Sequence, residues 1–594
     1  MTSISSVEKT LQRYNRILLL VAGLGGLLYG IDVGIIGGAL PYLEATSKLN
    51  SSELSIIVAA VLLGSVFSTL FAGLLADWMG RKPLMILSGA AFVLSVPVIA
   101  LSQGYGPLFL GRLLQGVSGG LVGMVVPLYL AECLAAKERG RGTGVFQWLL
   151  TLGIFVAACI GIYYSYHVAE VARTASSQEV WDVKNHAWRR IFWMSMPPGI
   201  LFVLGGFFVS ESPRWLFRRG RKTAALEALR RSRTEEQAAL EMGEMEQIAR
   251  EAAGPQGTDQ ALAQSRTRAD SIWRRRYVLP FLLACVILAC NTATGINSVI
   301  GFNTNILLQS GLSDLSAHWG YVVFTLCNFL FTIVGMTLVD RKGRKFLFLV
   351  GTSGIIVSLL CAGGLFVHSE KHRYDAAPAI QAMAHGDTLT LRYDDATALQ
   401  LVPAGIFNGQ RSSLAVIYSY GGFTATTTPV RTGEAGGAAI EIDRASCVPA
   451  GKVQAFFTNP FADLDAARAA PLKIVHAYVS PVPNAMNGWL MAIFLYMFVG
   501  FYASGPGVCV WLALSELMPT RIRSNGMSVA LVLNQLVSTT LAAIFLPVVG
   551  KYGYATMFFL FSGFTVVYLL TVALFLPETK GKTLEEIEKH FEAA

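Results

Sequence analysis

Charged residues are scarce in this sequence. Asp, Glu, Lys and Arg together make up only 14% of the 594 residues, whereas 53% are hydrophobic. Soluble globular domains carry about 25% charged residues. The composition therefore excludes an ordinary soluble protein and indicates a protein whose main partner is the lipid bilayer.

Cysteine is scarce as well. Of the eight cysteines, only Cys447 lies in a polar region. The others lie in or beside apolar segments without the spacing of metal ligands: Cys133, Cys159, Cys285, Cys290, Cys327, Cys361 and Cys509. We interpret them as packing residues and expect no metal site.

The sequence also lacks the motifs of the common enzyme classes. It has no glycine-rich phosphate loop followed by lysine, and no nucleophile elbow. The net charge of +9 does not indicate nucleic-acid binding, because the basic residues gather in loops on one side of the apolar segments. We expect neither an enzyme nor a nucleic-acid-binding protein, and no cofactor.

Twelve apolar segments have about the 20 residues needed to cross a bilayer. They lie at residues 16–40, 55–78, 84–103, 107–133, 143–165, 190–209, 278–305, 317–339, 345–367, 487–514, 525–548 and 555–576. Loops rich in Lys and Arg remain on the cytoplasmic side. We therefore expect a multi-pass protein of the plasma (inner) membrane with both termini in the cytoplasm.

A charged loop occurs twice. Asp77-Trp-Met-Gly80-Arg81-Lys82 follows the second span, and Asp340-Arg-Lys-Gly343-Arg344-Lys345 follows the eighth. Repetition at equivalent places predicts two related bundles of six helices. Gly73 is expected to let helices approach closely. A plain topology signal with a turn glycine is the alternative interpretation of one copy alone.

This duplication divides the chain into segments. We expect an all-α membrane fold with a first bundle at 1–213, a cytoplasmic helical linker at 214–276, and a cytoplasmic tail at 578–594. The second bundle occupies 277–367 and 485–577, and between these parts lies an extracytoplasmic insertion at 368–484. Alternating and apolar stretches between Gly, Pro, Asn and Asp predict that the insertion is a small β-rich domain.

The linker carries charges at helical spacing, which favours short amphipathic helices interrupted at Gly254-Pro255 over a merely solvated segment.

Asp32 lies inside the first apolar segment, where a carboxylate is costly unless it is neutral or paired. Its expected partner is Arg112, near the start of the fourth segment. The proton affinity of a buried carboxylate depends on its distance from a guanidinium, so a change in their separation can bind or release a proton. We interpret the pair as a proton-coupling site; a static pair that only fixes helix packing is the alternative.

Several motifs resemble those of one family, the sugar porters of the major facilitator superfamily, which includes bacterial sugar–proton symporters and facilitative glucose transporters. Besides the duplicated loop, they cover the chain except for 368–484. They are Pro127-Leu-Tyr-Leu-Ala-Glu132 followed by Arg139-Gly-Arg141-Gly, Glu211-Ser-Pro-Arg214-Trp-Leu, Gly295-Ile-Asn297, Gly505-Pro-Gly507 through Trp511 to Ser515-Glu516, and Pro577-Glu578-Thr-Lys580-Gly581. The resemblance implies twelve helices in two bundles.

The resemblance also implies a sugar-binding site. The family's polar and aromatic positions correspond to Gln147, Asn291, Thr292, Asn297, Asn328, Trp511 and Asn534, with Tyr29 and Gln535 beside them. Amides can pair with adjacent hydroxyls, and an aromatic ring covers the C–H face of a sugar. An isolated Asn in a membrane helix is otherwise a packing residue.

The sequence departs from the family pattern at five positions, which lie in three places. Two glutamines are replaced by Asn291 and Thr292, an expected aromatic pair reads Gly301-Phe302, and Gln535 stands where related symporters can carry tryptophan. Hexose, pentose and inositol therefore all remain possible substrates.

Charges between the spans form the third expected set. They are Asp77, Arg81, Glu132, Arg141, Glu211, Arg214, Asp340, Arg344, Glu516 and Arg523. We expect salt bridges between helices that hold the outward-facing state and break when the halves rock. The alternative is that these charges only fix the topology.

Together these features predict a monomeric transporter that imports a monosaccharide or related polyol together with protons by alternating access. A facilitative uniporter and a transporter-like nutrient receptor are the alternatives.

Overall fold

The computed structural model describes residues 6–594 except 48, 135, 254–274, 404–410, 433–437, 453–454, 456–458, 460, 519–522, 581–590 and 592–594. Within this part of the chain, twelve helical segments are long and apolar enough to cross a membrane. They confirm the twelve predicted spans.

The N-terminal half consists of the first six spans. Its helices are α1 (Ser6–Thr46), α2 (Ser51–Met79), α3 (Arg81–Ala100), α4 (Tyr105–Cys133), α5 (Ala136–Val171), and α6 (Ser177–Trp193) followed by α7 (Met196–Phe208). The sixth span is broken near Ser195, which separates α6 from α7.

The C-terminal half repeats this plan. Its helices are α12 (Arg275–Ala293), α13 (Ile296–Gly301), α14 (Asn303–Gln309), α15 (Asp314–Lys342), α16 (Arg344–Glu370), α21 (Ala485–Ser504), α22 (Pro506–Leu517), α23 (Arg523–Tyr552) and α24 (Tyr554–Phe575). The seventh span is interrupted at Gly295, whose φ of 84° favours glycine.

Glycines bring α2 and α4 into close contact. A Cβ atom on Gly116 would lie 2.0 Å from the carbonyl oxygen of Val61, and one on Gly64 would lie 2.2 Å from that of Leu113. Gly73 does not belong to this contact, because its Cβ would meet only Met124, at an ordinary 3.6 Å. The expectation that Gly73 is needed for close approach is therefore wrong.

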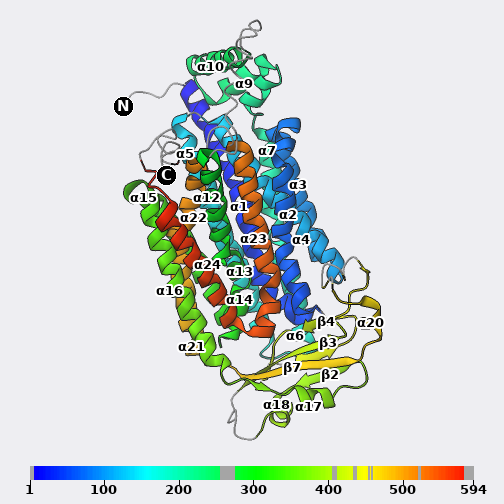
Figure 1. Ribbon diagram of the computed structural model, residues 1–594. Coiled ribbons are helices and arrows are strands. Elements are labelled where there is room, and N and C mark those ends of the chain that lie inside the picture. Colours follow the sequence, from blue (N-terminus) through cyan, green and yellow to red (C-terminus); the bar gives the residue numbers. More distant parts are fainter. Residues whose placement is uncertain are drawn as a thin grey trace.

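The linker forms three helices, α8 (Pro213–Arg218), α9 (Lys222–Ser232) and α10 (Glu235–Ala253). They confirm the helical prediction for this part, while Gly254 and Pro255 lie outside the described residues. Figure 1 shows α9 and α10 at one end of the bundle and the insertion at the opposite end. We call these the linker end and the insertion end.

The insertion contains strands, as predicted. In chain order its elements are β1 (Tyr374–Asp375), α17 (Ala377–Ala382), β2 (Leu389–Tyr393), α18 (Asp395–Leu401), β3 (Ser412–Tyr420), β4 (Phe423–Thr426), β5 (Val430–Arg431), β6 (Ala438–Ile442), α20 (Leu464–Ala469) and β7 (Leu472–Pro481). One antiparallel sheet has the order β1-β7-β3-β4 with β5 also on β3, and β2 pairs with β6 in a second. The insertion has a buried hydrophobic core of its own, which contains Leu414, Val416 and Val479.

The insertion touches both halves. It leaves the C-terminal half through α16 and returns through α21. On that half Thr426 packs against Gly550, and Arg431 donates to the carbonyl of Leu308. On the N-terminal half, the side-chain amide of Asn50 donates to the carbonyl of Ser446 at 2.7 Å. The insertion thus bridges the halves.

Candidate functional site: a buried carboxylate beside an amide cluster

Asp32 is fully buried in the middle of α1, with an exposed fraction of 0%. Neither of its carboxylate oxygens has a hydrogen-bond partner among the described residues. Arg112 on α4 is close enough to interact with it electrostatically. The guanidinium donates instead to Gln115 at 2.6 Å and lies 5.6 Å from the ring centre of Phe192. The two charges are neighbours without forming a hydrogen-bonded ion pair.

Gly119 makes room for this carboxylate. A Cβ atom there would lie 2.7 Å from Oδ2 of Asp32 and 3.3 Å from the ring of Tyr29. The missing side chain therefore lets Asp32 and Tyr29 lie directly against α4.

Tyr29 connects the carboxylate with the C-terminal half. It precedes Asp32 by three residues and so lies on the same face of α1, one turn away. Its phenol is close enough to the side chain of Gln535 on α23 for a polar interaction. Gln535, at the position where related symporters can carry tryptophan, thus provides a polar contact between the halves.

Four of the predicted sugar-site positions lie on the C-terminal side of this contact: Asn291, Thr292, Asn297 and Asn534. Asn291 donates to the Tyr502 hydroxyl at 3.1 Å, and Asn297 donates to Ser538 at 2.7 Å. The Thr292 hydroxyl donates to the carbonyl of Asn534 at 3.2 Å. The carbonyl oxygen of the Asn291 side chain is buried without a partner among the described residues. We call this group, on α12, α13, α21 and α23, the amide cluster.

Gln147 and Asn328 lie on helices that meet at the boundary of the halves. Gln147 is partly buried on α5 and Asn328 is buried on α15. Their neighbours in the chain, Trp148 and Phe329, stack with ring centres 5.5 Å apart. Trp511 on α22 is 46% exposed, and no described contact joins it to the amide cluster.

Tyr502 and Ser538 complete the amide cluster, but they lie outside the motifs that resemble the family and were not predicted. Both are ordinary polar residues in apolar helices, so only their contacts with Asn291 and Asn297 distinguish them.

Hydrogen bonds join the two halves at the insertion end. Tyr42 and Ser165 both donate to Asp314 at 2.8 Å. Thr304 donates to the carbonyl of Gly37 at 2.7 Å, and Tyr321 to that of Gly34 at 2.8 Å. The structure is therefore closed at the insertion end.

Ion pairs at the linker end lie within each half. In the N-terminal half, the Arg81 guanidinium pairs with Glu132 at 2.8 Å and with the exposed Asp77 at 3.0 Å. Glu211 accepts from the backbone N–H groups of Arg81 and Lys82 at the start of α3. Burial raises the pKa of Glu211, an effect that these backbone hydrogen bonds oppose.

The C-terminal half has the same arrangement. Arg344 pairs with Glu516 at 3.0 Å, and Glu578 accepts from the backbone N–H groups of Arg344 and Lys345. Glu578 thus takes the place of Glu211. This role of Glu578 was not predicted from the sequence, although its motif follows the last span of the second half just as the Glu211 motif follows the last span of the first half.

Arg214 is exposed on α8 and forms no ion pair with a described residue. The side chains of Arg141, Asp340 and Arg523 lie outside the described part of the structure. A role of these charges in holding the outward-facing state stays a prediction, because no ion pair among the described residues at this end joins the two halves.

The fold and this buried polar site define a membrane transporter built from two six-helix halves. Residues 18–384 and 467–591 match the model of the family described as "Sugar (and other) transporter". The chain therefore belongs to this sugar transporter family and has the fold of the major facilitator superfamily.

Curated relatives are similar along nearly the whole chain. The human proton myo-inositol cotransporter is 27% identical over 97% of this chain and 82% of its own length. The glucose transporter GlcP of Staphylococcus epidermidis is 25% identical over 97% of each protein. The major myo-inositol transporter IolT of Bacillus subtilis is 24% identical over 97% of this chain and 94% of its own.

Among solved structures, the inward open xylose transporter XylE of E. coli has a TM-score of 0.62 at 18% identity. The match covers 96% of this chain and 98% of that one. This likeness supports the major facilitator fold.

Proposed function

We propose that the protein is a proton-coupled transporter that imports a neutral monosaccharide or cyclic polyol by alternating access. It acts as a monomer in the plasma (inner) membrane, with the insertion outside and both termini in the cytoplasm. Basic residues such as Arg81, Lys82 and Arg344 at the linker end support this orientation.

The carboxylate of Asp32 carries the proposal. It is buried without a hydrogen-bond partner among the described residues, and an ionised carboxylate in that condition is costly. A proton removes the cost, while the approach of Arg112 favours the ionised form. Movement of α1 against α4 therefore changes the proton affinity of the site.

Tyr29 provides the link to the substrate. Protonation of Asp32 removes a negative charge one helical turn from Tyr29, whose phenol lies close to Gln535 on the helix that also carries Asn534 and Ser538. Neutral amides and hydroxyls donate and accept without requiring a charged ligand, which suits a polyol. Inositol is the leading candidate, because the human relative and IolT are named as carriers of myo-inositol.

The test is uptake of radiolabelled myo-inositol, glucose, galactose and xylose into proteoliposomes, with and without an inward proton gradient. We expect one substrate to accumulate only with the gradient. Asp32→Asn should abolish accumulation but retain exchange of labelled for unlabelled substrate, because the amide cluster is intact. Accumulation by Asp32→Asn at the wild-type level would refute the coupling role, and equilibration independent of the gradient would identify a uniporter.

A further inference from the structure

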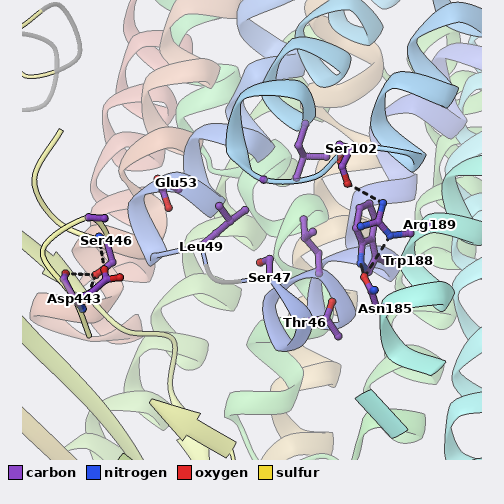
Figure 2. Close-up of a pocket in the computed structure, with 14 residues that line it drawn as sticks. Thr46, Ser47, Leu49, Glu53, Ser102, Asn185, Trp188, Arg189, Asp443 and Ser446 are labelled. Atoms are coloured by element: carbon purple, nitrogen blue, oxygen red, sulfur yellow. Dashed lines mark hydrogen bonds between the residues drawn. The ribbon is translucent and has the colours of Figure 1, made fainter. Parts of the chain in front are cut away.

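A cavity lined by both polar and apolar side chains lies between the insertion and the N-terminal half. Its volume is about 490 Å³, which falls within the range of roughly 300–1,000 Å³ for small-molecule sites. Figure 2 shows its walls, which come from the insertion end of the N-terminal half and from the segment around Asp443 and Ser446. Neither Asp32 nor the amide cluster lines it. We call it the interface cavity.

One wall of the interface cavity is held in place by its own contacts. Arg189 donates to the carbonyls of Ala100 and Ser102, both at 2.8 Å, and lies 4.3 Å from the ring centre of Trp188. The Trp188 indole donates to Asn185 at 3.2 Å. These side chains are ordered before a ligand arrives, which lowers the entropy cost of binding.

Several polar groups in the lining still have hydrogen-bonding capacity. Glu53 accepts from the backbone of Asn50 through Oε2, and Asp443 accepts from the backbone of Ser446 through Oδ1. The second oxygen of each carboxylate accepts no hydrogen bond from a described residue. The hydroxyl of Ser47 is buried and has no partner in the described part of the chain. The cavity therefore offers both acceptors and donors.

This combination selects for a neutral, hydroxyl-rich ligand. An anion would meet the carboxylates of Glu53 and Asp443, whereas a simple cation would meet the guanidinium of Arg189. A hydroxyl can donate to a carboxylate and accept from an N–H group at the same time. Leu43 and Leu49 add apolar surface that suits the C–H groups of a sugar or cyclic polyol.

We propose that the interface cavity is an accessory binding site for the same class of polyol or monosaccharide that the transporter carries, filled from the insertion side of the membrane. This inference rests on the proposed function for its ligand class. Its walls belong to the N-terminal half and to a domain carried by the C-terminal half, so the site is complete when the insertion end is closed.

The test is a count of binding sites by equilibrium dialysis of the full chain in lipid nanodiscs, with radiolabelled myo-inositol, glucose, galactose and xylose as probes. We expect two bound molecules of one probe per wild-type chain. Glu53→Gln combined with Asp443→Asn should weaken one site by at least about tenfold, because hydrogen bonds to charged groups are lost. Both amides keep an acceptor for the existing backbone contacts. Asn297→Ala should weaken the other site.

Ser47→Ala is the control for misfolding. The hydroxyl has no partner in the described structure, so its removal should leave the melting temperature unchanged while weakening the accessory site by about fivefold, the value of one neutral hydrogen bond. A single bound molecule that is lost in Asn297→Ala, and unaffected by Ser47→Ala and by the double variant, would overturn this inference and leave the proposed function standing. No binding of any probe to the wild-type chain would overturn both.

Discussion

The contact between Asn50 and Ser446 should favour the state that is closed at the insertion end. The insertion is carried by the C-terminal half, and the Asn50 amide donates to the Ser446 carbonyl at 2.7 Å. Alternating access separates the halves at this end, which breaks the hydrogen bond. A typical net value of about 1 kcal/mol corresponds to a change of about fivefold in the ratio of open to closed molecules.

Asn50→Asp tests this contact without removing the helix cap. Asn50 is the N-cap of α2, and its side-chain oxygen accepts from the Glu53 backbone at 2.9 Å. Aspartate caps a helix about as well as asparagine, but it lacks the amide donor and places a carboxylate oxygen near the Ser446 carbonyl. The matched control is Asn484→Asp, because Asn484 caps α21 in the same way within the C-terminal half.

Distances between spin labels provide the assay. Labels attached through unnatural amino acids at the exposed residues Gln178 and Met486 leave the native cysteines in place. We expect the ratio of long to short distances to rise by about fivefold or more in Asn50→Asp and to remain at the wild-type value in Asn484→Asp. Equal ratios in the two variants would refute the reasoning.

Three further predictions follow from single positions. Gly119→Ala should displace Asp32, because its Cβ would lie 2.7 Å from the carboxylate; we expect at least a tenfold loss of proton-driven uptake with retained exchange, and wild-type uptake would contradict this. Gly116→Ala should sharply reduce the yield of folded protein, because its Cβ would lie 2.0 Å from a backbone carbonyl of α2, whereas Gly73→Ala should be tolerated; size-exclusion chromatography compares them, and equal losses would show that the contact is not specific. In the insertion, burial raises the pKa of Asp375, but backbone N–H donors and a neighbouring histidine outweigh it, so the pKa is lowered overall. The ionised Asp375 should therefore stabilise the insertion at pH values above the ordinary Asp pKa of about 4, and this stabilisation should be lost as the pH falls below that value. Limited proteolysis at a series of pH values should show that the insertion of the Asp375→Asn variant depends less on acid than that of the wild type. Identical pH profiles for the two proteins would refute this role of Asp375.

The sequence predicted the spans well because hydropathy is a local property. The second predicted span, at 55–78, corresponds to the helical segment Ser51–Met79. The pattern of β2 was also readable, since Leu389, Leu391 and Tyr393 are buried and alternate with exposed residues. In each case the pattern of apolar and polar residues within one short stretch of the chain is enough to predict the element.

Other features depend on contacts between distant residues. Nothing near Gln535 indicates that it meets Tyr29, and nothing near Ser446 indicates that it meets Asn50. The pairing of β7 with β1 and with β3 likewise brings together strands that are far apart in the chain. Family resemblance supplied the positions of the amides but not their partners.

The pairing of β1 with β7 has an evolutionary consequence. Tyr374 lies opposite Val479, so the chain enters and leaves the insertion through two neighbouring strands. The two ends of the domain therefore lie side by side where it joins the bundle. Its gain, loss or replacement need not alter the spacing of α16 and α21.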